Sequence, residues 1–595
     1  MTVNCISVYL TSELRLEQAL KEAGVEKPAS VRKLAISGEI TEADFGYIRE
    51  NMAKTLQELD MGGATSTEII GRNFFSGCES LTSVIIPAST LIIGKTAFED
   101  CRALTEISVH PDNPEFASAN GILYNKDFSE LLFFPCAHES EVVVSELRKY
   151  YDSLKFEFVL PASVTKIGAT AFANCKKLLS VDIPETVTGI GGGAFEGCTA
   201  LTSVYIPASV VEIYINDYED TYRRAFYGCS ALKSITVHPD NPVYASCDGV
   251  LFNKDITELI IYPAGLQGEY KIPETVNKIG FYAFAKCSGL TDVYIPDLAT
   301  DIDNGAFAGC TGLTSVIIPD SVKRIGGCAF YDCKNLRSIN IPDSVTEIGA
   351  SVFSSTDLKS LFIPASVVYI GLWAFCDFPV KVHPGNPAYS SKNSVLFNKK
   401  KTTLIEFPCW KTGDYIIPKT VKRIEQYAFY DCSGLTSITI PASVVKFGSL
   451  SSTFYECSNL ASITVHPQNR FYSSHEGVLF NKNMTVLLKF PPKWQGDEYI
   501  VPDSVEKIDT SAFKDCVGLT SVIIPDSVVE IEFAAFAGCS GLKKVVIPKA
   551  TVNIGIGAFD KHVYVKVHPK NPVYKSIKGK IVRKNPNEKW DIFYI

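Results

Sequence analysis

The eighteen cysteines are the first residues of this 595-residue chain whose type and spacing could support chemistry. A structural zinc site uses close pairs such as C-x-x-C, and the sequence contains none; the commonest gap between cysteines is 23 residues. We therefore predict no metal site at these cysteines. Twelve of them share one setting, three residues after a Phe and three before a Leu: Cys78, Cys101, Cys175, Cys198, Cys229, Cys287, Cys310, Cys333, Cys432, Cys457, Cys516 and Cys539.

Disulfide bonding between these twelve positions is the second chemical possibility. If the copies stack as β-strands, neighbouring cysteine Cα atoms lie about 5 Å apart, which is within disulfide range. Three copies, however, hold Thr356, Phe378 or His562 at this place. A packing position accepts such replacements more readily than a disulfide framework does. The pattern predicts buried free thiols that behave as small apolar side chains.

Histidine and glycine motifs do not indicate a catalytic site either. Five of the eight histidines begin an H-P-x-N motif, and they lie 83 to 145 residues apart: His110, His238, His383, His466 and His568. We predict turns held by side-chain to backbone hydrogen bonds, because histidines so far apart do not share one metal. The string GIGGGA at 189–194 imitates a dinucleotide fingerprint but fills an ordinary repeat slot. With no H-E-x-x-H, G-x-S-x-G or P-loop, we predict a non-enzyme without catalytic, cofactor-binding or metal residues.

A repeat of about 23 residues accounts for the recurring cysteine. Its skeleton is I-P-x-S-V-x-x-I-G-x-x-A-F-x-x-C-x-x-L-x-S-[VI]-x-I-P, and its central Phe occurs fifteen times between Phe75 and Phe559. Pro273, Pro296 and Pro319 follow one another at this spacing, which independent domains would not produce. Such a period predicts a solenoid with one continuous core.

Each repeat divides into a strand and a turn. The segment L-x-S-[VI]-x-I alternates apolar and polar residues and ends at Pro, which predicts a short strand in a parallel sheet. In A-F-x-x-C-x-x-L the apolar residues recur every third position, which is the spacing of a helical or 3₁₀ turn that packs onto the sheet. Gly in the I-G pair and Pro after the strand mark the corners.

Five H-P-x-N modules interrupt the array, and each reads as two apolar runs joined by a polar turn, typical of a β-hairpin. We place these modules at 109–160, 237–272, 382–417, 465–501 and 567–595. Residues 1–66 form an N-terminal cap with a helix and degenerate rungs, and residues 67–595 form the solenoid. Longer insertions at 136–160 and 214–224 are expected to protrude from it.

Composition narrows the functional classes. The chain is 46% hydrophobic and 21% charged, so it should fold. A net charge of -8 gives no overall basic footprint, although a local basic patch is compatible with it, so we predict no nucleic-acid partner. No secretion signal and no apolar run of about 18 residues is visible, so membrane association would require an anchor not seen in this chain.

The repeat skeleton resembles the BspA-like leucine-rich-repeat surface proteins of mouth and gut bacteria, over roughly residues 70–570. The H-P-x-N modules and the SGEI, DFGYIRENM and LQELDM segments are similar to the gut Bacteroidales type. The resemblance implies an α/β repeat fold, a leucine-rich-repeat solenoid with a parallel β-sheet. It also implies an extracellular or cell-surface protein that binds a host matrix protein, another cell or a glycan.

The outward face of the predicted sheet is the place left for binding. In L-x-S-V-x-I-P the Ser and the following x point away from the core, and the x column mixes aromatic, aliphatic and small polar residues. From this column we predict ligand contact at Tyr205, Tyr294, Ile317, Asn340 and Phe362. The alternative hypothesis is a structural spacer or scaffold whose binding is confined to the inserted loops.

Overall fold

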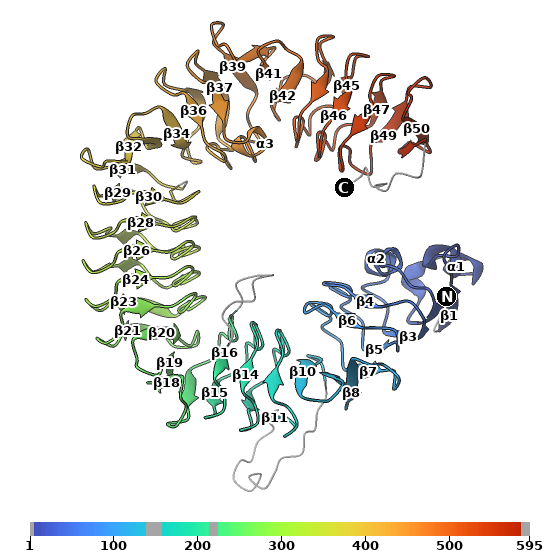
Figure 1. Ribbon diagram of the computed structural model, residues 1–595, viewed down its shortest axis with the longest axis vertical. Coiled ribbons are helices and arrows are strands. Elements are labelled where there is room, and N and C mark those ends of the chain that lie inside the picture. The colour runs from blue at the N-terminus through green and yellow to red at the C-terminus, as the bar shows by residue number, and fades with distance from the viewer. Residues whose placement is uncertain (1–4, 139–156, 214–223, 376, 585–595) are drawn as a thin grey trace. The chain divides into compact units, whose positions relative to one another are not determined.

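The computed structural model describes residues 5–138, 157–213, 224–375 and 377–584 (Figure 1). Inter-residue contacts divide the chain into two compact units. The first comprises residues 1–321 with 329–335, and the second comprises 322–328 with 336–595. Almost all regular structure is short β-strand, and among the described residues no helix is long and apolar enough to span a bilayer.

Two helices cover the beginning of the first unit. Helix α1 (Leu16–Glu22) packs beside β1 (Ile6–Leu10) and beside α2 (Glu42–Asn51). Helix α2 begins with a capping box, in which the side chains and backbone of Thr41 and Asp44 exchange hydrogen bonds. Its buried Phe45 lies 3.9 Å from the Phe74 ring, centroid to centroid, next to the first repeat phenylalanine. The cap therefore shields the open end of the apolar core.

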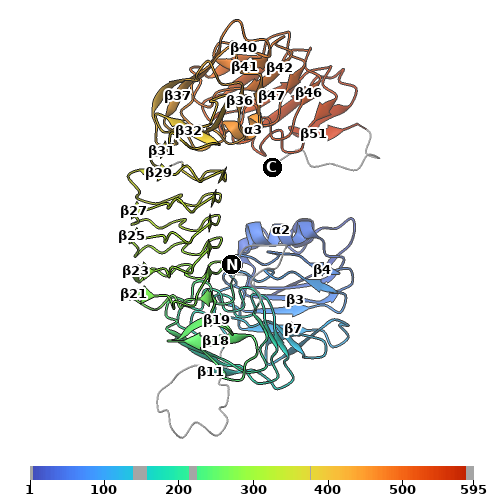
Figure 2. The same ribbon diagram turned by 60° about the vertical axis from the view of Figure 1, so that its left-hand side comes forward.

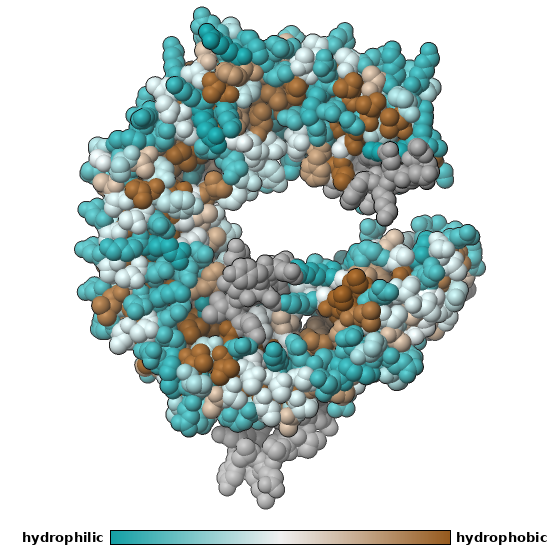
Figure 3. Space-filling view, in the orientation of Figure 1, coloured by the Kyte–Doolittle hydropathy of each residue, from teal (hydrophilic) through white to brown (hydrophobic). Residues whose placement is uncertain are grey.

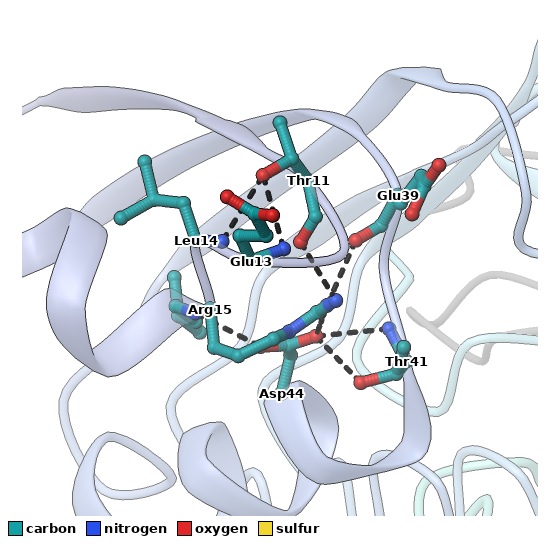
Figure 4. Close-up of polar contacts among 8 residues, drawn as sticks. Thr11, Glu13, Leu14, Arg15, Glu39, Thr41 and Asp44 are labelled. Carbon is teal, nitrogen blue, oxygen red and sulfur yellow. Dashed lines mark hydrogen bonds and ion pairs between the residues drawn. The ribbon is translucent and has the colours of Figure 1, made fainter.

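The buried carboxylate of Asp44 connects the two helices of this cap through hydrogen bonds and an ion pair (Figure 4). It forms an ion pair with Arg15 and accepts hydrogen bonds from the Leu16 and Thr41 amides, each 2.9 Å long. Burial alone would raise the pKa of Asp44, but the hydrogen bonds from Arg15, Leu16 and Thr41 outweigh it and lower this pKa. One carboxylate thus ties the start of α1 to the start of α2.

The first sheet of the unit runs from the cap into the repeats as five parallel strands. Its order is β1, β2 (Lys33–Gly38), β3 (Glu58–Ala64), β5 (Ser83–Ile86) and β7 (Glu106–Val109). In β5 the side chains of Val84 and Ile86 are buried, because alternate residues of a strand face the core. The parallel-sheet solenoid predicted from the period is confirmed.

Each repeat contributes a second strand that the sequence pattern does not reveal. In the repeat of Phe172, β12 (Lys166–Ile167) precedes the turn and β13 (Ser180–Asp182) follows it. Strand β12 pairs in parallel with β14 (Gly189–Ile190), whereas β13 pairs in parallel with β11 (Glu157–Val159). Two ladders of parallel strands therefore run along the unit, one of strands that precede the turns and one of strands that follow them. Figure 2 labels β21 (Gly268–Lys271) and β23 (Leu290–Tyr294), which are paired neighbours in the second of these ladders.

The turn A-F-x-x-C-x-x-L stacks on its counterpart in the next repeat. The Phe172 amide donates to the Ala194 carbonyl at 2.7 Å, and the rings of Phe172 and Phe195 are stacked with centroids 5.1 Å apart. The same stacking recurs in the second unit, where the Phe513 and Phe536 centroids are 4.6 Å apart. Within the turn of Phe172, the Cys175 amide donates to the Phe172 carbonyl and the Leu178 amide donates to the Cys175 carbonyl. Hydrogen bonds to the carbonyl three residues earlier are those that the spacing predicted.

The repeat cysteines form a hydrogen-bonded column in this core, and the prediction that they are buried is confirmed for all twelve. Between adjacent repeats the thiol donates to the carbonyl of the preceding phenylalanine, for example from Cys198 to Phe172 at 3.0 Å and from Cys310 to Phe284 at 3.0 Å. After an inserted module the same contact lengthens, to 3.8 Å for Cys175 and 4.0 Å for Cys516. Burial raises the pKa of Cys229 to about 12.

Each complete inserted module is a three-stranded meander, one strand more than the predicted hairpin. In the second module β18 (Tyr244–Cys247), β19 (Val250–Asn253) and β20 (Glu258–Ile261) are antiparallel, and β20 then pairs in parallel with β22 (Lys278–Ile279). Its chain next enters the other ladder through β21. The module therefore takes the place of one repeat, and among the described residues the strand pairing of both ladders stops before the module and resumes after it.

The H-P-x-N motif holds the start of each module, as predicted. The Nδ1 atom of His238 accepts the Asp240 amide at 3.1 Å. Asn241 is fully buried: its amide donates to the carbonyls of Pro207 and Val210, and its oxygen accepts the amides of Val243 and Tyr244. All four hydrogen-bonding positions of this side chain are satisfied.

The buried column predicts low thiol reactivity. We expect a disulfide-forming reagent at pH 8 to label only the more accessible cysteines of the native protein, such as Cys5, Cys136 and Cys247. Thiolate is the reactive form, and burial shields the repeat thiols from both water and the reagent. The measurement is the number of thiols labelled before and after denaturation. Rapid labelling of a dozen thiols in the native protein would contradict this assignment.

The four hydrogen bonds of Asn241 predict a large effect of its substitution. Replacement by Ala leaves two buried carbonyls and two buried amides without partners, so we expect a loss of at least about 3 kcal/mol of local stability. Amide exchange of the β17 (Ser234–Val237) to β18 segment would measure this loss. Asp112→Ala, at an exposed position of the first module, is the control and should leave exchange unchanged.

Candidate binding surface

Two of the five predicted contact residues lie on neighbouring strands of the first unit. Tyr294 ends β23 opposite Lys271 of β21; its side chain is 55% exposed, and its hydroxyl donates to Glu269 at 3.5 Å. Ile317 follows β25 (Ser315–Val316), which lies beside β23, and is 77% exposed. The structure thus brings an aromatic ring and an aliphatic side chain together on one outward face.

Tyr205 lies in a different sheet of the same unit. It is part of β15 (Ser203–Ile206), faces Thr236 of β17, and is 45% exposed. Its ring meets His238 edge to face at 6.5 Å between centroids. No strand pairing joins the β15–β17 sheet to the sheet of Tyr294 among the described residues of this unit.

The other two predicted residues belong to the second unit. Asn340 follows β27 (Ser338–Ile339) and is exposed. Phe362 lies in β29 (Leu361–Ile363) opposite Lys381 of β31 (Val380–Val382), and its exposed ring contacts His383 edge to face at 5.9 Å. All five side chains point outward, but a role in binding remains a prediction. Most of the insertions at 136–160 and 214–224 lies outside the described residues.

A longer apolar stripe occurs farther along the second unit, and the sequence analysis missed it. Strands β43 (Glu498–Ile500), β45 (Ser521–Ile523) and β47 (Lys544–Ile547) are parallel neighbours. They expose Ile500, Ile523 and Val546 by 64%, 47% and 45%. Ile500 and Ile523 are direct partners in the register, and Val546 occupies the same column. Figure 3 shows several separate hydrophobic patches on an otherwise hydrophilic face.

Aromatic residues also cluster on the turns of the second unit. Trp373 lies 4.7 Å from Tyr427 and 4.9 Å from Tyr430, and Tyr430 stacks on Tyr455 at 5.6 Å, all between centroids. Trp373 and Tyr427 have φ angles of 57° and 60°, the left-handed region that favours glycine. A bulky residue there costs about 1–2 kcal/mol, so these side chains are held against their backbone preference.

Two buried charges occupy equivalent places in the third and fourth modules. Glu406 accepts a hydrogen bond from the Phe375 amide at 3.0 Å, where an uninterrupted array would supply a backbone carbonyl. Lys489 donates to the Ser511 carbonyl at 3.4 Å and lines a pocket of about 270 Å³ with Asp515 and Tyr455. Burial raises the pKa of Glu406 to about 7 and lowers the pKa of Lys489.

The side chains that could bind a metal ion do not converge in the described part of the chain. No group of three or more His, Cys, Asp or Glu side chains there could hold a metal ion. The module histidines instead accept backbone amides, as Gly385 to His383 at 2.9 Å and Gln468 to His466 at 3.2 Å. We assign these groups to the architecture of the turns.

Two ladders of short parallel strands over a column of apolar turns define a leucine-rich-repeat protein. The chain belongs to the BspA-type leucine-rich-repeat family: the family model described as BspA type leucine rich repeat region (6 copies) matches residues 53–120, 148–266, 262–380, 407–495 and 495–577. The family expected from the repeat skeleton is thus confirmed. A comparison with curated protein sequences gives no significant match.

Several solved structures are similar to this chain. A leucine rich cell surface protein from Faecalibacterium prausnitzii is 26% identical, with 72% of this chain and 94% of that chain covered and a TM-score of 0.37. A leucine-rich repeat protein from Bacteroides ovatus is 25% identical, with coverage of 76% and 98% and a TM-score of 0.27. The pneumococcal vaccine antigen PcpA is 19% identical, with coverage of 55% and 79% and a TM-score of 0.29.

The buried Glu406 predicts a pH-dependent stability. Its folded pKa of about 7 lies above the ordinary value of 4.5, so between these pH values the unfolded chain loses its proton first. The protonated carboxyl of Glu406 contributes about 3 kcal/mol to the free energy of unfolding. This contribution is complete below pH 4.5 and is lost as the pH rises through about 7. Glu406→Gln should remove this dependence and make the second unit more stable than wild type at pH 8.

Thermal unfolding of wild type and Glu406→Gln at pH 5 and pH 8 checks this expectation. Glu506→Gln is the matched control, because Glu506 is exposed and its substitution should not alter the pH profile. Parallel profiles for wild type and Glu406→Gln would show that Glu406 does not titrate in this range.

Proposed function

We propose that this protein is a non-enzymatic adhesion or ligand-binding protein of the cell surface or secreted space. It binds a host matrix protein, another cell or a glycan through the outward face of its sheets. The observation that carries this proposal is the exposure of apolar side chains in register on adjacent strands, above all Ile500, Ile523 and Val546. Contiguous exposed apolar residues mark interaction sites more often than scattered ones do.

The surroundings of the stripe suit a protein partner. The parallel column on the same face holds Glu498, Ser521, Lys544 and Tyr564, so charged and polar groups border the apolar residues. An apolar centre with a polar rim is the usual anatomy of a protein interface. Tyr294 and Ile317 repeat this combination on a smaller scale in the first unit, next to Glu269 and Lys271.

The structural use of the reactive groups supports a non-enzymatic role. The repeat thiols donate to backbone carbonyls, and the module histidines accept backbone amides. The repeat thiols are buried, so they cannot act as nucleophiles without opening the fold, and one ring nitrogen of each module histidine is occupied by the turn. The Faecalibacterium protein named above is described as a cell surface protein, and we propose the same location for this chain.

Substitution of the outward apolar residues tests this proposal. Ile500→Ser with Ile523→Ser, and separately Tyr294→Ser with Ile317→Ser, should weaken binding to matrix proteins or cells at least tenfold, because each removes about 2 kcal/mol or more of apolar contact. The measurement is surface-plasmon resonance with the purified chain over a panel of matrix proteins and glycans.

Two exposed apolar residues away from the strands provide controls. Leu298→Ser and Ile556→Ser change side chains that are 60% and 49% exposed and lie outside every strand. They should leave affinity unchanged. If both sheet-face variants kept full affinity for every ligand of the wild type, the sheet face would not be the binding surface. Binding lost only on deletion of 139–156 and 214–223 would favour the spacer alternative.

A further inference from the structure

A strongly basic segment lies near the end of the described chain, although the whole protein is acidic. From Lys543 to Lys584 the sequence contains ten lysines and one arginine but only one carboxylate, that of Asp560. The net charge of the chain is -8, so this local excess is concealed in the total. Clustered charge of one sign attracts ligands of the opposite sign.

Several of these lysines converge on one hollow of the second unit. Strand β49 (Tyr564–Val567) lies beside the hairpin of β50 (Tyr574–Ile577) and β51 (Lys580–Arg583), and Figure 1 labels β49 and β50 in red near the end of the chain. These strands border a pocket of about 530 Å³. Five lysines line the pocket and no carboxylate does; they are Lys544, Lys566, Lys575, Lys578 and Lys584. Among the described residues, the first four of them form no ion pair.

An exposed ring stands in the middle of these charges. Tyr564 is the register partner of Lys544 and is 52% exposed. Its ring packs against Gly579, where an added Cβ would lie 2.5 Å from a ring atom, so the hairpin holds it in place. Lys566 leaves the same strand two residues later and therefore points to the same face.

The other modules show that the fold does not require these lysines. At the place of Lys566, the first, second and fourth modules have Ser108, Thr236 and Thr464, and the third has Lys381. At the place of Lys575 the first four modules have only Ala or Ser, and at the place of Lys578 they have Asn, Asp or Glu. Lys578 also has a φ of 49°, which Asn adopts more easily than Lys does.

Lys584 differs from the other four, because its ammonium group donates to the Asn571 carbonyl. The equivalent Lys126 and Lys482 make the same kind of contact, to the carbonyls of Asn113 and Pro467. Lys584 is thus part of the module architecture. Lys575 and Lys578 occur only in the last module, so the shared module architecture does not account for them.

We propose that this pocket binds an acidic polysaccharide, a single chain carrying carboxylate or sulfate groups, with Tyr564 against a sugar ring and Lys544, Lys566, Lys575 and Lys578 on the anionic groups. The site lies apart from the patch of Tyr294 and Ile317 but shares a sheet with the stripe of Ile500, Ile523 and Val546, because Lys566 is the register partner of Val546. The proposal rests on the proposed binding role and gives it a ligand class. Ile500→Ser with Ile523→Ser, which keeps every lysine, tells the two apart, because it should weaken binding of a protein ligand and leave polysaccharide binding unchanged.

The form of the pocket favours one polysaccharide chain over other polyanions. A DNA duplex or an anionic bilayer presents its charges on a broad surface and contacts protruding residues, whereas these lysines border a hollow. Single-stranded nucleic acid is bound mainly by several stacking aromatic residues, and Tyr564 is the one exposed aromatic side chain that lines this pocket. One ring flanked by cations suits a sugar chain with spaced anionic groups.

The test uses the full chain and the triple variant Lys566→Ser, Lys575→Ala, Lys578→Asn, which introduces the residues of the first module. Affinity for heparin and for polygalacturonate is measured against salt concentration by calorimetry or fluorescence anisotropy. The variant should bind at least about tenfold more weakly, with a log–log salt slope smaller by about 2 to 3, because three cationic contacts are lost. Tighter binding of heparin than of polygalacturonate would identify sulfate as the preferred group, and the reverse would identify carboxylate.

A matched variant controls for net charge. Lys392→Ala, Lys400→Ala, Lys419→Ala removes three exposed lysines of the same unit and should leave affinity and salt slope unchanged. Tyr294→Ser with Ile317→Ser should also keep polysaccharide binding, which separates this site from the sheet-face patch. Equal affinities of the two lysine variants, absence of polysaccharide binding, or tighter binding of duplex DNA or phosphatidylserine vesicles would each overturn the proposal.

Discussion

The carbonyl of the repeat phenylalanine is the contact on which the solenoid depends. In the repeat of Phe172 this oxygen accepts the Cys175 amide of its own turn at 3.1 Å and the Cys198 thiol of the next repeat at 3.0 Å. A buried carbonyl with two acceptor positions is thereby satisfied across the junction between repeats. Twelve of the fifteen repeats place a small, largely apolar side chain with one donor here, whereas Phe378 fills the position with a buried ring. Thr356, which replaces cysteine once, donates instead to Phe353 of its own turn.

The inserted modules interrupt this pattern and thereby create places with their own chemistry. A module replaces the A-F-x-x-C turn, so the preceding turn loses the carbonyl acceptors of a following turn. Glu406 supplies the missing acceptor to Phe375 in the third module, and Lys489 donates to a turn carbonyl in the fourth. The buried asparagines compensate in the same way at the module start, where Asn241 joins two carbonyls and two amides. Irregular positions therefore carry the polar groups that the regular array avoids.

Sequence reasoning predicted the features that recur at a fixed period. The repeat phenylalanines lie 22 to 25 residues apart wherever no insertion separates them, and this period fixes the solenoid. The positions of Cys310 and Asn241 follow from it. The second strand of each repeat was missed because two residues, as in Lys166–Ile167, show no alternation. The burial of Glu406 could not be predicted, because a charged residue in an alternating strand is expected to face the solvent and its apolar neighbour Ile405 the core. For the surface, outward orientation of Tyr294 and Phe362 followed from the strand period, whereas the alignment of Ile500 with Ile523 required the register.

Internal repetition separates structural from functional residues without any comparison to other chains. Every module shares one backbone, so a side chain present in all copies, such as Asn241 and Asn571, is explained by that backbone. A side chain found in one copy is not explained by that backbone, and a contact made by that copy alone is one physical reason for it. Lys575 and Lys578 stand in the last module where other copies fold with Ala, Ser, Asn, Asp or Glu, and Lys578 does so in an unfavourable conformation. Mutual repulsion of unpaired lysines adds a further cost that an anionic partner offsets. By the same reasoning, differences between copies are the places to seek ligand specificity in this solenoid.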